Sequence, residues 1–582
     1  MDKFKFKVLP KVWIESYNTL RILTDLSNYK SLKIIGLTII VTLLEIVSIA
    51  LMIPLLKLIN NNGALIVSEA NNTATNKIIM VLNLIGLPVT FVFISLIIAM
   101  IVLLRQYLNF SLTKFLSKIK VDNNRILRKK LFESTFLSKP EIIEDLGHGS
   151  YIELMVNQSS RGASYLVHIM KYISILLLSF GYFSIALILA PVVTLVGMTI
   201  AIIILIFADK IINKIKKITE NNIKDLKFFS KYLGECFSSW KVIKLANSYD
   251  YENNRNDKWI NEIADQDYQV ELNLAKSTLL ITVTIMMLLI LVLNIGVKIN
   301  HIELSLLVMF SIMCLRLIPI MLNIVIFQTR ITLAAESLNR IFKVINNLKE
   351  NEEIDLGSKK ISLNNSIVFD NMSFKYPNSE SYVFKNLNET IPFGKVTSIC
   401  GKSGSGKSTL LDIISRIQGS YEGSISIDGI SIKDISLVNY RNNISLLSQN
   451  PFIFDDTVLS NISYGNVNIS KDEIINAAKL ANADDFIINL ADGYDTILGE
   501  RGSKLSGGQI QRIVLARILA SKAKIIILDE PTSALDDSSA DRIIDALKNI
   551  KNTNLYTLII SSHSKKILEL GDKLIDVDIL NN

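Results

Sequence analysis

Cysteine and histidine are scarce in this sequence. Its 582 residues include three cysteines and four histidines. Cys236, Cys314 and Cys400 have no paired spacing, so we expect neither a disulfide framework nor a zinc site. Three such thiols suit a reducing cytosol or an apolar interior.

Charge is also sparse, and it is unevenly placed. Charged residues make up 20% of the chain against 49% hydrophobic residues, and the mean hydropathy of +0.37 is high for a soluble enzyme. Apolar runs of ~20 residues, the length that crosses a bilayer, cluster before residue 330. We therefore expect a transmembrane domain over residues 1–345 and a soluble α/β domain over residues 346–582. The formal charge of +8 would also fit a nucleic-acid binder, but the basic residues lie beside apolar runs, where membrane topology already places them.

Six apolar spans are expected in the first domain. Their approximate bounds are residues 32–59, 88–112, 162–187, 191–212, 276–297 and 304–330. The opening segment MDKFKFKVLPKVWIESYNTL lacks the apolar core and the cleavage site of a signal peptide. We interpret it as an interfacial helix, and we expect no peptidase domain before the first span.

The two long connections between spans carry most of the positive charge. The positive-inside rule puts these loops, the N-terminus and the second domain in the cytoplasm. Helical patterns in the loops predict membrane helices that extend into the cytosol, with short crosswise helices near Pro140–Asp145 and Cys236–Lys241. The basic residues are Lys114, Lys118, Lys120, Arg125, Arg128, Lys129 and Lys130 in the first loop, and Lys214, Lys216, Lys217, Lys224, Lys227, Lys231, Lys241 and Lys244 in the second.

Ionisable side chains inside apolar spans are costly unless they face protein or water. Lys171 and Asp209 stand near span ends, where they can reach the interface. Glu45 near the middle of its span, and Arg316 in CLRLIPI, are expected to line a cavity or to pair across the bundle. The sequence does not separate these two roles. The full set of candidates is Glu45, Arg105, His168, Lys171, Asp209 and Arg316.

A phosphate-binding loop stands in the second domain. The apolar strand VTSIC leads into GKSGSGKSTLLDII, which satisfies G-x-x-x-x-G-K-[ST] in a strand–loop–helix context. The glycines let backbone N–H groups wrap phosphates, Lys407 adds a positive charge and Ser408 can ligate Mg²⁺. The ATP-binding residues expected here are Gly401, Lys402, Ser403, Gly404, Ser405, Gly406, Lys407, Ser408 and Thr409.

A second apolar strand, IIILDE, ends in two acids. Asp529 is expected on the side of the metal, and Glu530 is expected to polarise the attacking water. Phosphoryl transfer depends mainly on positioning and charge neutralisation, which these carboxylates supply together with the phosphate loop.

LSGGQ at Leu505–Gln509 resembles the signature of the ATP-binding cassette (ABC) transporters, and the resemblance covers nearly the whole chain. Tyr376 in FKYP resembles the adenine-stacking aromatic residue, and His563 in SSHS resembles the switch histidine. Gln449 in LLSQNPFIF resembles the Q-loop residue, with a catalytic and metal-side role. Asp536 ends SALD, which resembles the D-loop.

GERGSKLSGGQ and the six spans before the cassette resemble the exporter branch of this family. The resemblance implies a six-helix transmembrane domain of the exporter fold (type I, or type IV) followed by a P-loop α/β nucleotide-binding domain. It also implies an ATPase that uses ATP and Mg²⁺ to drive transport.

In this family the signature faces the phosphate loop of a second cassette. Ser506 and the N–H groups of Gly507 and Gly508, at a helix N-terminus, would form a second anion cradle. One chain with one cassette therefore needs a partner. Because the motif residues are intact, two identical chains would build two competent sites, while a heterodimer stays open. The signature residues are Leu505, Ser506, Gly507, Gly508 and Gln509.

Two features depart from the family pattern. Pro531 follows Glu530 where exporters commonly have alanine, a variant that keeps the carboxylate. The sequence ends 19 residues after His563, without the usual glycine-containing hairpin, so we expect a trimmed C-terminal edge.

The membrane half resembles the branch that contains the bacterial flippase of lipid-linked oligosaccharides. The similar segments are LLEIVSIALMIPLLKLI, LRLIPIMLNIV and WKVIKLANSYDYE. In that branch cationic cavity residues handle a pyrophosphate-sugar head, which points to Arg316, with Arg105 and Lys171 as companions. Glu45 is a further candidate at the substrate site. We expect a lipid-linked oligosaccharide or glycolipid at a bacterial cytoplasmic membrane. A peptide or other secreted metabolite, and a lipid or drug-like amphiphile, remain alternatives.

Two other protein classes use such cassettes. Soluble DNA-repair and translation factors would suit a basic chain, but six spans fused to one cassette argue against them and against a nucleic-acid partner. A gated channel with a regulatory cassette usually has a degenerate ATP site, and none is seen here. Cell fractionation tests the first class, because a soluble protein would contradict the transporter interpretation.

Overall fold

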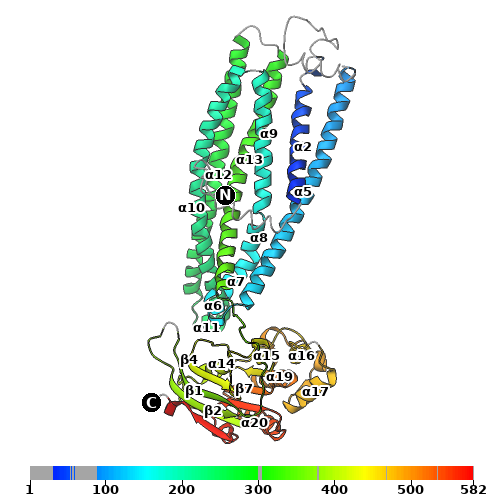
Figure 1. Ribbon diagram of the computed structural model, residues 1–582. Coiled ribbons are helices and arrows are strands. Elements are labelled where there is room, and N and C mark those ends of the chain that lie inside the picture. Colours follow the sequence, from blue (N-terminus) through cyan, green and yellow to red (C-terminus); the bar gives the residue numbers. More distant parts are fainter. Residues whose placement is uncertain are drawn as a thin grey trace. The chain divides into compact units, whose positions relative to one another are not determined.

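Two units make up the chain, Met1–Glu352 and Glu353–Asn582 (Figure 1). The computed structural model describes residues 30–52, 54–55, 58, 88, 90–189, 191–298, 304–376, 379–466, 468–533 and 535–580. The N-terminal segment expected to form an interfacial helix lies outside these residues. Helix α13 continues past the expected domain boundary at residue 345, because Ile341, Ile345 and Leu348 are buried at helical spacing.

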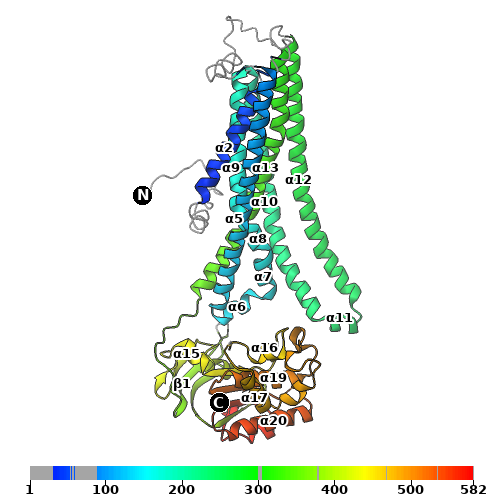
Figure 2. The ribbon, with the colours of Figure 1, turned by 90° about the vertical axis from the view of Figure 1, so that its right-hand side faces the viewer.

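Long helices that run side by side form the first unit (Figures 1 and 2). Within the described residues, helices long and apolar enough to cross a membrane occur at Lys33–Ala50, Phe91–Phe136, His148–Leu187, Tyr249–Met287 and Leu315–Glu350. The expected fourth span lies in α10, in a stretch where most side chains are outside the described set. The long helices are α2 (Lys30–Ala50), α5 (Phe91–Phe136), α9 (Tyr165–Leu189), α10 (Pro191–Ser238), α12 (Tyr249–Lys298) and α13 (Leu304–Glu350).

Helix α5 shows why these helices need an apolar solvent. Val92, Leu96, Met100 and Leu103 on this helix are largely exposed. A continuous apolar face of this size is unfavourable in water and favourable against lipid chains.

Short helices follow the ends of the long helices α5 and α10. Helix α6 (Pro140–Leu146) confirms the first predicted tip, and it begins at a proline, which suits the first turn of a helix. The second tip was predicted at Cys236–Lys241, and its start is wrong, since α10 continues to Ser238 and α11 spans Trp240–Leu245. The break falls at Ser239, whose backbone leaves the helical region. In Figure 2 the hairpin of α10, α11 and α12 departs from the other helices toward α11.

A kinked segment connects α6 to α9. It consists of α7 (His148–Glu153), a π-helical turn (Leu154–Gln158) and α8 (Ser159–Ala163). Gly162 of α8 lies against α13, where a Cβ atom would come within 3.3 Å of the Leu338 Cα. The two helices therefore approach closely here, and they position Arg161 and Ser164 beside α13.

Two sheets form the second unit. The antiparallel sheet has the order β2–β1–β4–β5, and the parallel sheet has the order β6–β7–β8–β3–β9. Antiparallel strands are β1 (Ser366–Phe374), β2 (Phe384–Pro392), β4 (Glu422–Ile427) and β5 (Ile430–Ser431). Parallel strands are β3 (Val396–Cys400), β6 (Ile444–Leu447), β7 (Ile525–Asp529), β8 (Thr557–Ser561) and β9 (Lys573–Asp576).

Strand β7 is buried on both faces. Ile525 and Ile527 belong to the core shared with the antiparallel sheet, whereas Ile526 and Leu528 belong to the core under α19. The alternation follows from the two-residue period of a strand, and burial on both sides explains the unbroken apolar run. The predicted strands VTSIC and IIILD are confirmed as β3 and β7.

Helices cover the sheets and follow the strand ends. They are α14 (Lys407–Ile414), α15 (Leu437–Asn442), α16 (Val458–Ile462), α17 (Lys471–Leu480), α18 (Asp484–Ile488), α19 (Gly507–Ala520), α20 (Asp537–Asn552), α21 (Lys565–Leu568) and α22 (Val577–Leu580). The result is the predicted fold class, a helical transmembrane domain followed by a nucleotide-binding-type α/β domain. Strand β8 lies between β3 and β7 and pairs in parallel with both, so the carboxyl ends of the three strands meet at one edge.

Candidate functional site

The phosphate loop follows β3 and closes around a lysine. Gly404 and Gly406 have backbone φ angles of +80° and +102°, which favour glycine. The Lys407 ammonium donates hydrogen bonds to the carbonyl oxygens of Gly401 and Lys402, both at 3.0 Å. It also lies 3.0 Å from His563 Nε2. The loop therefore holds a positive charge among its own carbonyl groups, at the start of α14.

Glu530 lies at the end of β7 between two other predicted site residues. Gln449 Nε2 donates to its Oε2 at 3.3 Å, and His563 Nε2 lies 3.4 Å from its Oε1. The Glu530 backbone is left-handed, with φ +48°, and its N–H donates to the carbonyl oxygen of Ser561 at 3.1 Å. A non-glycine residue held in this region stores backbone strain, which proteins retain mostly at functional sites.

The residues present fit ATP and a hard divalent cation. Asp529 is buried and accepts a hydrogen bond from the Ser561 hydroxyl, so its position is fixed. Ser408 is exposed at the start of α14. Among the described residues, no group of three His, Cys, Asp or Glu side chains could hold a metal ion. Mg²⁺ commonly binds one or two carboxylates together with phosphate and water oxygens.

An aromatic side chain stands beside the phosphate loop. Tyr376 is 40% exposed, and its hydroxyl is 2.9 Å from the Thr409 hydroxyl of α14. Its ring packs edge-on against Phe374, with 5.1 Å between the centroids. One side of the ring is thus supported and the rest is available to a base.

The signature segment lies at another helix start. Ser506 caps α19, because its hydroxyl accepts the Gln509 N–H at 3.3 Å and Gln509 Oε1 accepts the Ser506 N–H at 2.9 Å. Gly507 and Gly508 form the first turn, and Leu505 packs on the core. In the part of the chain that the structure describes, no hydrogen bond or ion pair joins this segment to the phosphate loop. Asp536 caps α20 by accepting the Ser539 N–H at 3.1 Å.

Glu45 forms ion pairs with two of the other ionisable residues predicted in the membrane domain. Its Oε1 lies 3.1 Å from Arg105 Nη1 and 3.5 Å from Arg316 Nη1, and it accepts a hydrogen bond from the Tyr182 hydroxyl at 3.4 Å. Arg316 therefore pairs across the bundle, which is one of the two roles its sequence context allowed. Its side chain stays 52% exposed, so the pairing leaves part of the guanidinium free.

Two other membrane candidates, Lys171 and His168, contact Phe327. The Lys171 ammonium stands 5.7 Å from the ring centroid of Phe327, a cation–π contact. His168 packs against the same ring at 6.0 Å between centroids. The side chain of Asp209 is outside the described set.

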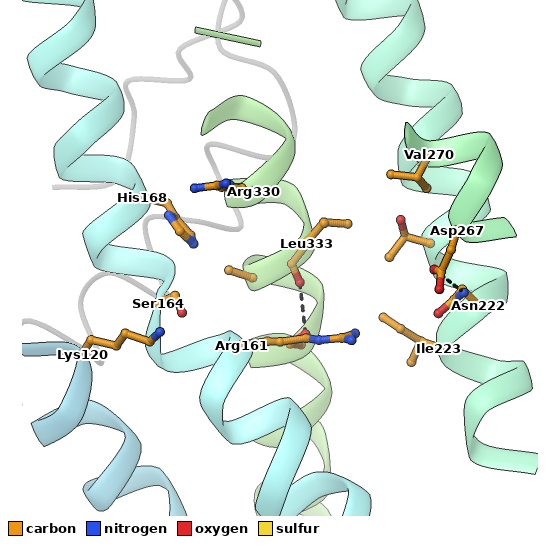
Figure 3. A pocket seen from close by; sticks show the side chains of 13 residues that line it. Lys120, Arg161, Ser164, His168, Asn222, Ile223, Asp267, Val270, Arg330 and Leu333 are labelled. Carbon is orange, nitrogen blue, oxygen red and sulfur yellow. Dashed lines mark hydrogen bonds between the residues drawn. The ribbon is translucent and has the colours of Figure 1, made fainter. Parts of the chain in front are cut away.

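A cavity of about 420 Å³ lies between α5, α8, α9, α10, α12 and α13, and some of its lining side chains are labelled in Figure 3. Lys120, Arg161 and Arg330 line it from the side of α5, α8 and α13, and within the described residues none of them has an ion-pair partner. The cavity's acid, Asp267, lies across from them and accepts a hydrogen bond from Asn222 at 3.2 Å.

Sequence reasoning identified one lining residue of this cavity, His168, as a membrane candidate. Its buried Nδ1 has no hydrogen-bond partner among the residues that the structure describes. In the sequence Lys120 is one of the loop charges, and Arg161 and Arg330 are not among the candidates. No local pattern identifies the three, because which basic residues share a cavity depends on how the helices pack.

Comparisons with known proteins agree with this geometry. A family model described as ABC transporter transmembrane region matches residues 33–324, and one described as ABC transporter matches residues 384–533. The chain belongs to the ABC transporter family. Its two units are therefore the membrane and ATP-binding parts of one such transporter, and the resemblance found in the sequence is confirmed.

Several proteins are similar to this ABC transporter. An ATP-dependent lipid A-core flippase of Syntrophus aciditrophicus (strain SB) is 39% identical over 236 residues, which are 40% of this chain and 39% of that protein. ABC transporter B family member 4 of Dictyostelium discoideum is 41% identical over 251 residues, 42% of this chain and 32% of that protein. This chain thus spans well under half the length of these relatives.

A solved structure shares the fold. The structure of a bacterial Atm1-family ABC exporter with ATP bound has a TM-score of 0.73 and covers 93% of both chains at 21% identity. The exporter fold predicted from the sequence is therefore confirmed.

Proposed function

We propose that this protein is an ATP-driven exporter or flippase that moves an amphiphile with an anionic head group across the cytoplasmic membrane of a bacterium. A lipid-linked oligosaccharide or glycolipid is the substrate class we favour. The cavity of Figure 3 carries the proposal, because it is lined by three cations that form no ion pair with any described residue, beside the apolar side chains of Ile223, Val270 and Leu333.

The charge of the cavity explains the preference for an anion. Lys120, Arg161 and Arg330 repel one another, and Asp267 offsets one of their three charges at most. A phosphate or pyrophosphate would relieve this repulsion, and a guanidinium can bind it through two parallel hydrogen bonds. The buried Nδ1 of His168, which bonds to none of the described residues, offers one further polar group.

The ATP site supplies the driving force in this proposal. Lys407 and the loop N–H groups would hold the phosphates, and Ser408, Asp529 and Gln449 would hold Mg²⁺, which neutralises phosphate charge. Glu530, fixed between Gln449 and His563, would orient the water for attack. Product release would then reset the two halves for another cycle.

A second chain completes each ATP site in this proposal. Within the described residues, no hydrogen bond or ion pair joins the signature at Ser506 to the phosphate loop. The signature begins α19, where the N–H groups of Gly507 and Gly508 are available to an anion. A homodimer is the simplest assembly, since the motif residues of both half-sites are intact. The names of the relatives, lipid A-core flippases among them, support a lipid substrate.

ATPase stimulation of purified protein in lipid vesicles tests the substrate class. We would titrate a lipid-linked saccharide, an uncharged amphiphile and a peptide. The proposal predicts stimulation by the anionic lipid, and a half-stimulating concentration raised about tenfold in Arg161→Ala and Arg330→Ala. Lys118→Ala, on the same helix as Lys120 but outside the cavity, should match the parent protein.

Other results would redirect the proposal. Stimulation by the peptide or by the uncharged amphiphile alone would replace the lipid-linked saccharide with that class. An anionic lipid that stimulates the two arginine variants and the parent at the same concentration would remove the cavity as its site.

A further inference from the structure

The C-terminal strand and helix bring a carboxylate to the phosphate loop. Strand β9 pairs in parallel with β3, with Asp576 opposite Cys400. Two residues further on, Asp578 of α22 accepts the backbone N–H of Lys402 with both oxygens, at 2.9 Å and 3.1 Å. The start of α22 is fixed in turn, because Asp576 Oδ1 accepts the Asp578 N–H at 3.0 Å.

This contact sets the direction of a carbonyl group in the loop. The Lys402 N–H and the Gly401 carbonyl belong to one trans peptide, in which they point in opposite directions. Asp578 holds the N–H, so the carbonyl points away from Asp578 and toward the Lys407 ammonium, which donates to it at 3.0 Å. Asp578 and Lys407 therefore hold opposite sides of the same peptide.

Position 401 lies in contact with both the loop and α22. A Cβ atom there would come within 2.6 Å of the Ser405 hydroxyl, which is too close, and 3.5 Å from Asp578 Oδ1, which is an ordinary van der Waals distance. The shape of the loop itself therefore requires glycine at position 401, and Asp578 lies against it in normal contact. A small displacement of Asp578 would therefore move the Gly401–Lys402 peptide to which it is hydrogen-bonded.

We propose that Asp578 is a positioning residue of the ATP site. It orients the Gly401–Lys402 peptide so that the Gly401 carbonyl keeps the Lys407 ammonium inside the phosphate loop. A carboxylate so close to the phosphates would by charge alone disfavour ATP, so its benefit must come from the hydrogen bond. The inference rests on the proposed function in one respect, that ATP is the ligand of this loop.

The test measures the dissociation constant of ATP for the full-length protein in lipid, by displacement of a fluorescent ATP analogue. Asp578→Ala removes the acceptor and should raise this constant about tenfold. Asp578→Asn keeps one acceptor oxygen and should stay within about threefold of the parent. The control Asp545→Ala removes an exposed carboxylate of α20 that contacts Lys548, and it should bind ATP like the parent.

A double variant tests whether Asp578 acts through the lysine. In a Lys407→Ala background, Asp578→Ala should weaken ATP binding by less than about twofold, because the group that it positions is gone. A full tenfold loss in that background would overturn the proposed route. Steady-state kinetics should show the loss mainly in the KM for ATP, with kcat reduced less.

Three patterns would overturn the inference. Equal, tighter ATP binding in the alanine and asparagine variants would assign Asp578 a purely electrostatic effect. Equal, weaker binding in both, with a lowered melting temperature, would make it a support of the sheet edge. If Asp578→Ala binds ATP as tightly as the parent, the contact with Lys402 contributes nothing to ATP binding.

If Asp578→Ala does not fold, Asp578→Glu replaces it. The longer side chain keeps the charge and displaces the carboxylate. If Asp578 positions the peptide, this variant should bind ATP more weakly than the parent; if only its charge matters, ATP binding should be unchanged. A parent protein that binds no ATP would contradict the proposed function itself. A parent that binds ATP beside variants that bind equally well would contradict this inference alone.

Discussion

Arg316 and Glu45 are joined across the membrane bundle, with 3.5 Å between Nη1 of the arginine and Oε1 of the glutamate. The residues come from α13 and α2, which are far apart in sequence. Arg105 of α5 shares the same oxygen at 3.1 Å. The ion pairs of this one carboxylate thus join α2, α5 and α13, and its loss leaves two guanidinium groups without this partner.

We predict that Glu45→Ala lowers the melting temperature of the protein. Removing one partner of a buried ion pair costs about 3–5 kcal/mol, and we expect roughly half of that because Arg316 is 52% exposed. Thermal melting in lipid should also show that Glu45→Ala/Arg105→Ala loses less than the sum of the single variants. Additive losses would mean that the pair contributes no coupling energy.

The same residues give a distinct result if Arg316 also contacts substrate. Arg316→Ala would then raise the half-stimulating concentration of an anionic lipid, and Arg316→Lys would restore only part of the effect, because an ammonium lacks the bidentate geometry. A melting temperature that falls with unchanged stimulation would restrict Arg316 to the ion pair.

Glu530→Gln should bind ATP and nearly stop hydrolysis. Loss of the water-orienting carboxylate should reduce turnover by on the order of 10²-fold or more, while the hydrogen bond from Gln449 can be kept by the amide oxygen. The control Glu569→Gln changes an exposed acid of the same domain. A Glu530→Gln protein with half the parental turnover would contradict the assigned role.

Complementation between two inactive chains tests the shared ATP site. Lys407→Ala and Ser506→Arg should each abolish activity as homodimers. In mixed dimers both lesions fall in one composite site and the other is intact, so an equal mixture should recover at most about a quarter of the parental sites. No recovery, in a mixture shown by tag-specific purification to contain mixed dimers, would count against sites built from two chains.

The surface pair Glu473–Lys522 predicts a pH dependence of stability. The hydrogen bond from the Lys522 ammonium at 2.6 Å, followed by those from Ser470, lowers the pKa of Glu473 from 4.5 to about 2. Because the pKa of Glu473 is lower in the folded protein than in the unfolded chain, its ionised carboxylate stabilises the fold at pH values above 4.5. This stabilisation is lost as the pH falls toward 2. Glu473→Gln should therefore melt below the parent at pH 7, and the difference should close toward pH 2.

Melting of the full-length protein at several pH values checks this. Glu380→Gln is the matched control, since Glu380 is exposed and forms no ion pair within the described part of the chain. If the difference in melting temperature between Glu473→Gln and the parent grew as the pH fell, the predicted pH dependence would be contradicted.

The ATP-site half of the fold could be predicted in detail. The motif around Lys407 needs a strand, a glycine-rich turn and a helix in immediate succession, so local sequence determines where the residues lie. Glu530 follows a strand buried on both sides, and parallel pairing brings that strand end to the same edge as β3. Local patterns and one topological rule were therefore sufficient to bring Lys407 and Glu530 to one edge, whereas His563 was identified by its resemblance to the switch histidine.

The membrane cavity and the Asp578 contact could not be predicted, because neither has a local pattern. Lys120, Arg161 and Arg330 lie on three helices, and each looks like the charge that ends a span on the cytosolic side. Which of them share a cavity depends on how the helices rotate and pack. Asp578 follows a short edge strand, and only the parallel register with β3 places it at Lys402.

The central claim is that ATP hydrolysis at Glu530 drives movement of an anionic amphiphile. Its most direct test is the rate at which a labelled lipid-linked oligosaccharide crosses the membrane of proteoliposomes, measured by protection from an enzyme added outside. The account predicts crossing that requires ATP in the parent protein and falls to the protein-free rate in Glu530→Gln. Equal crossing in both proteins, or ATP hydrolysis by the parent with no crossing of this lipid, would contradict it.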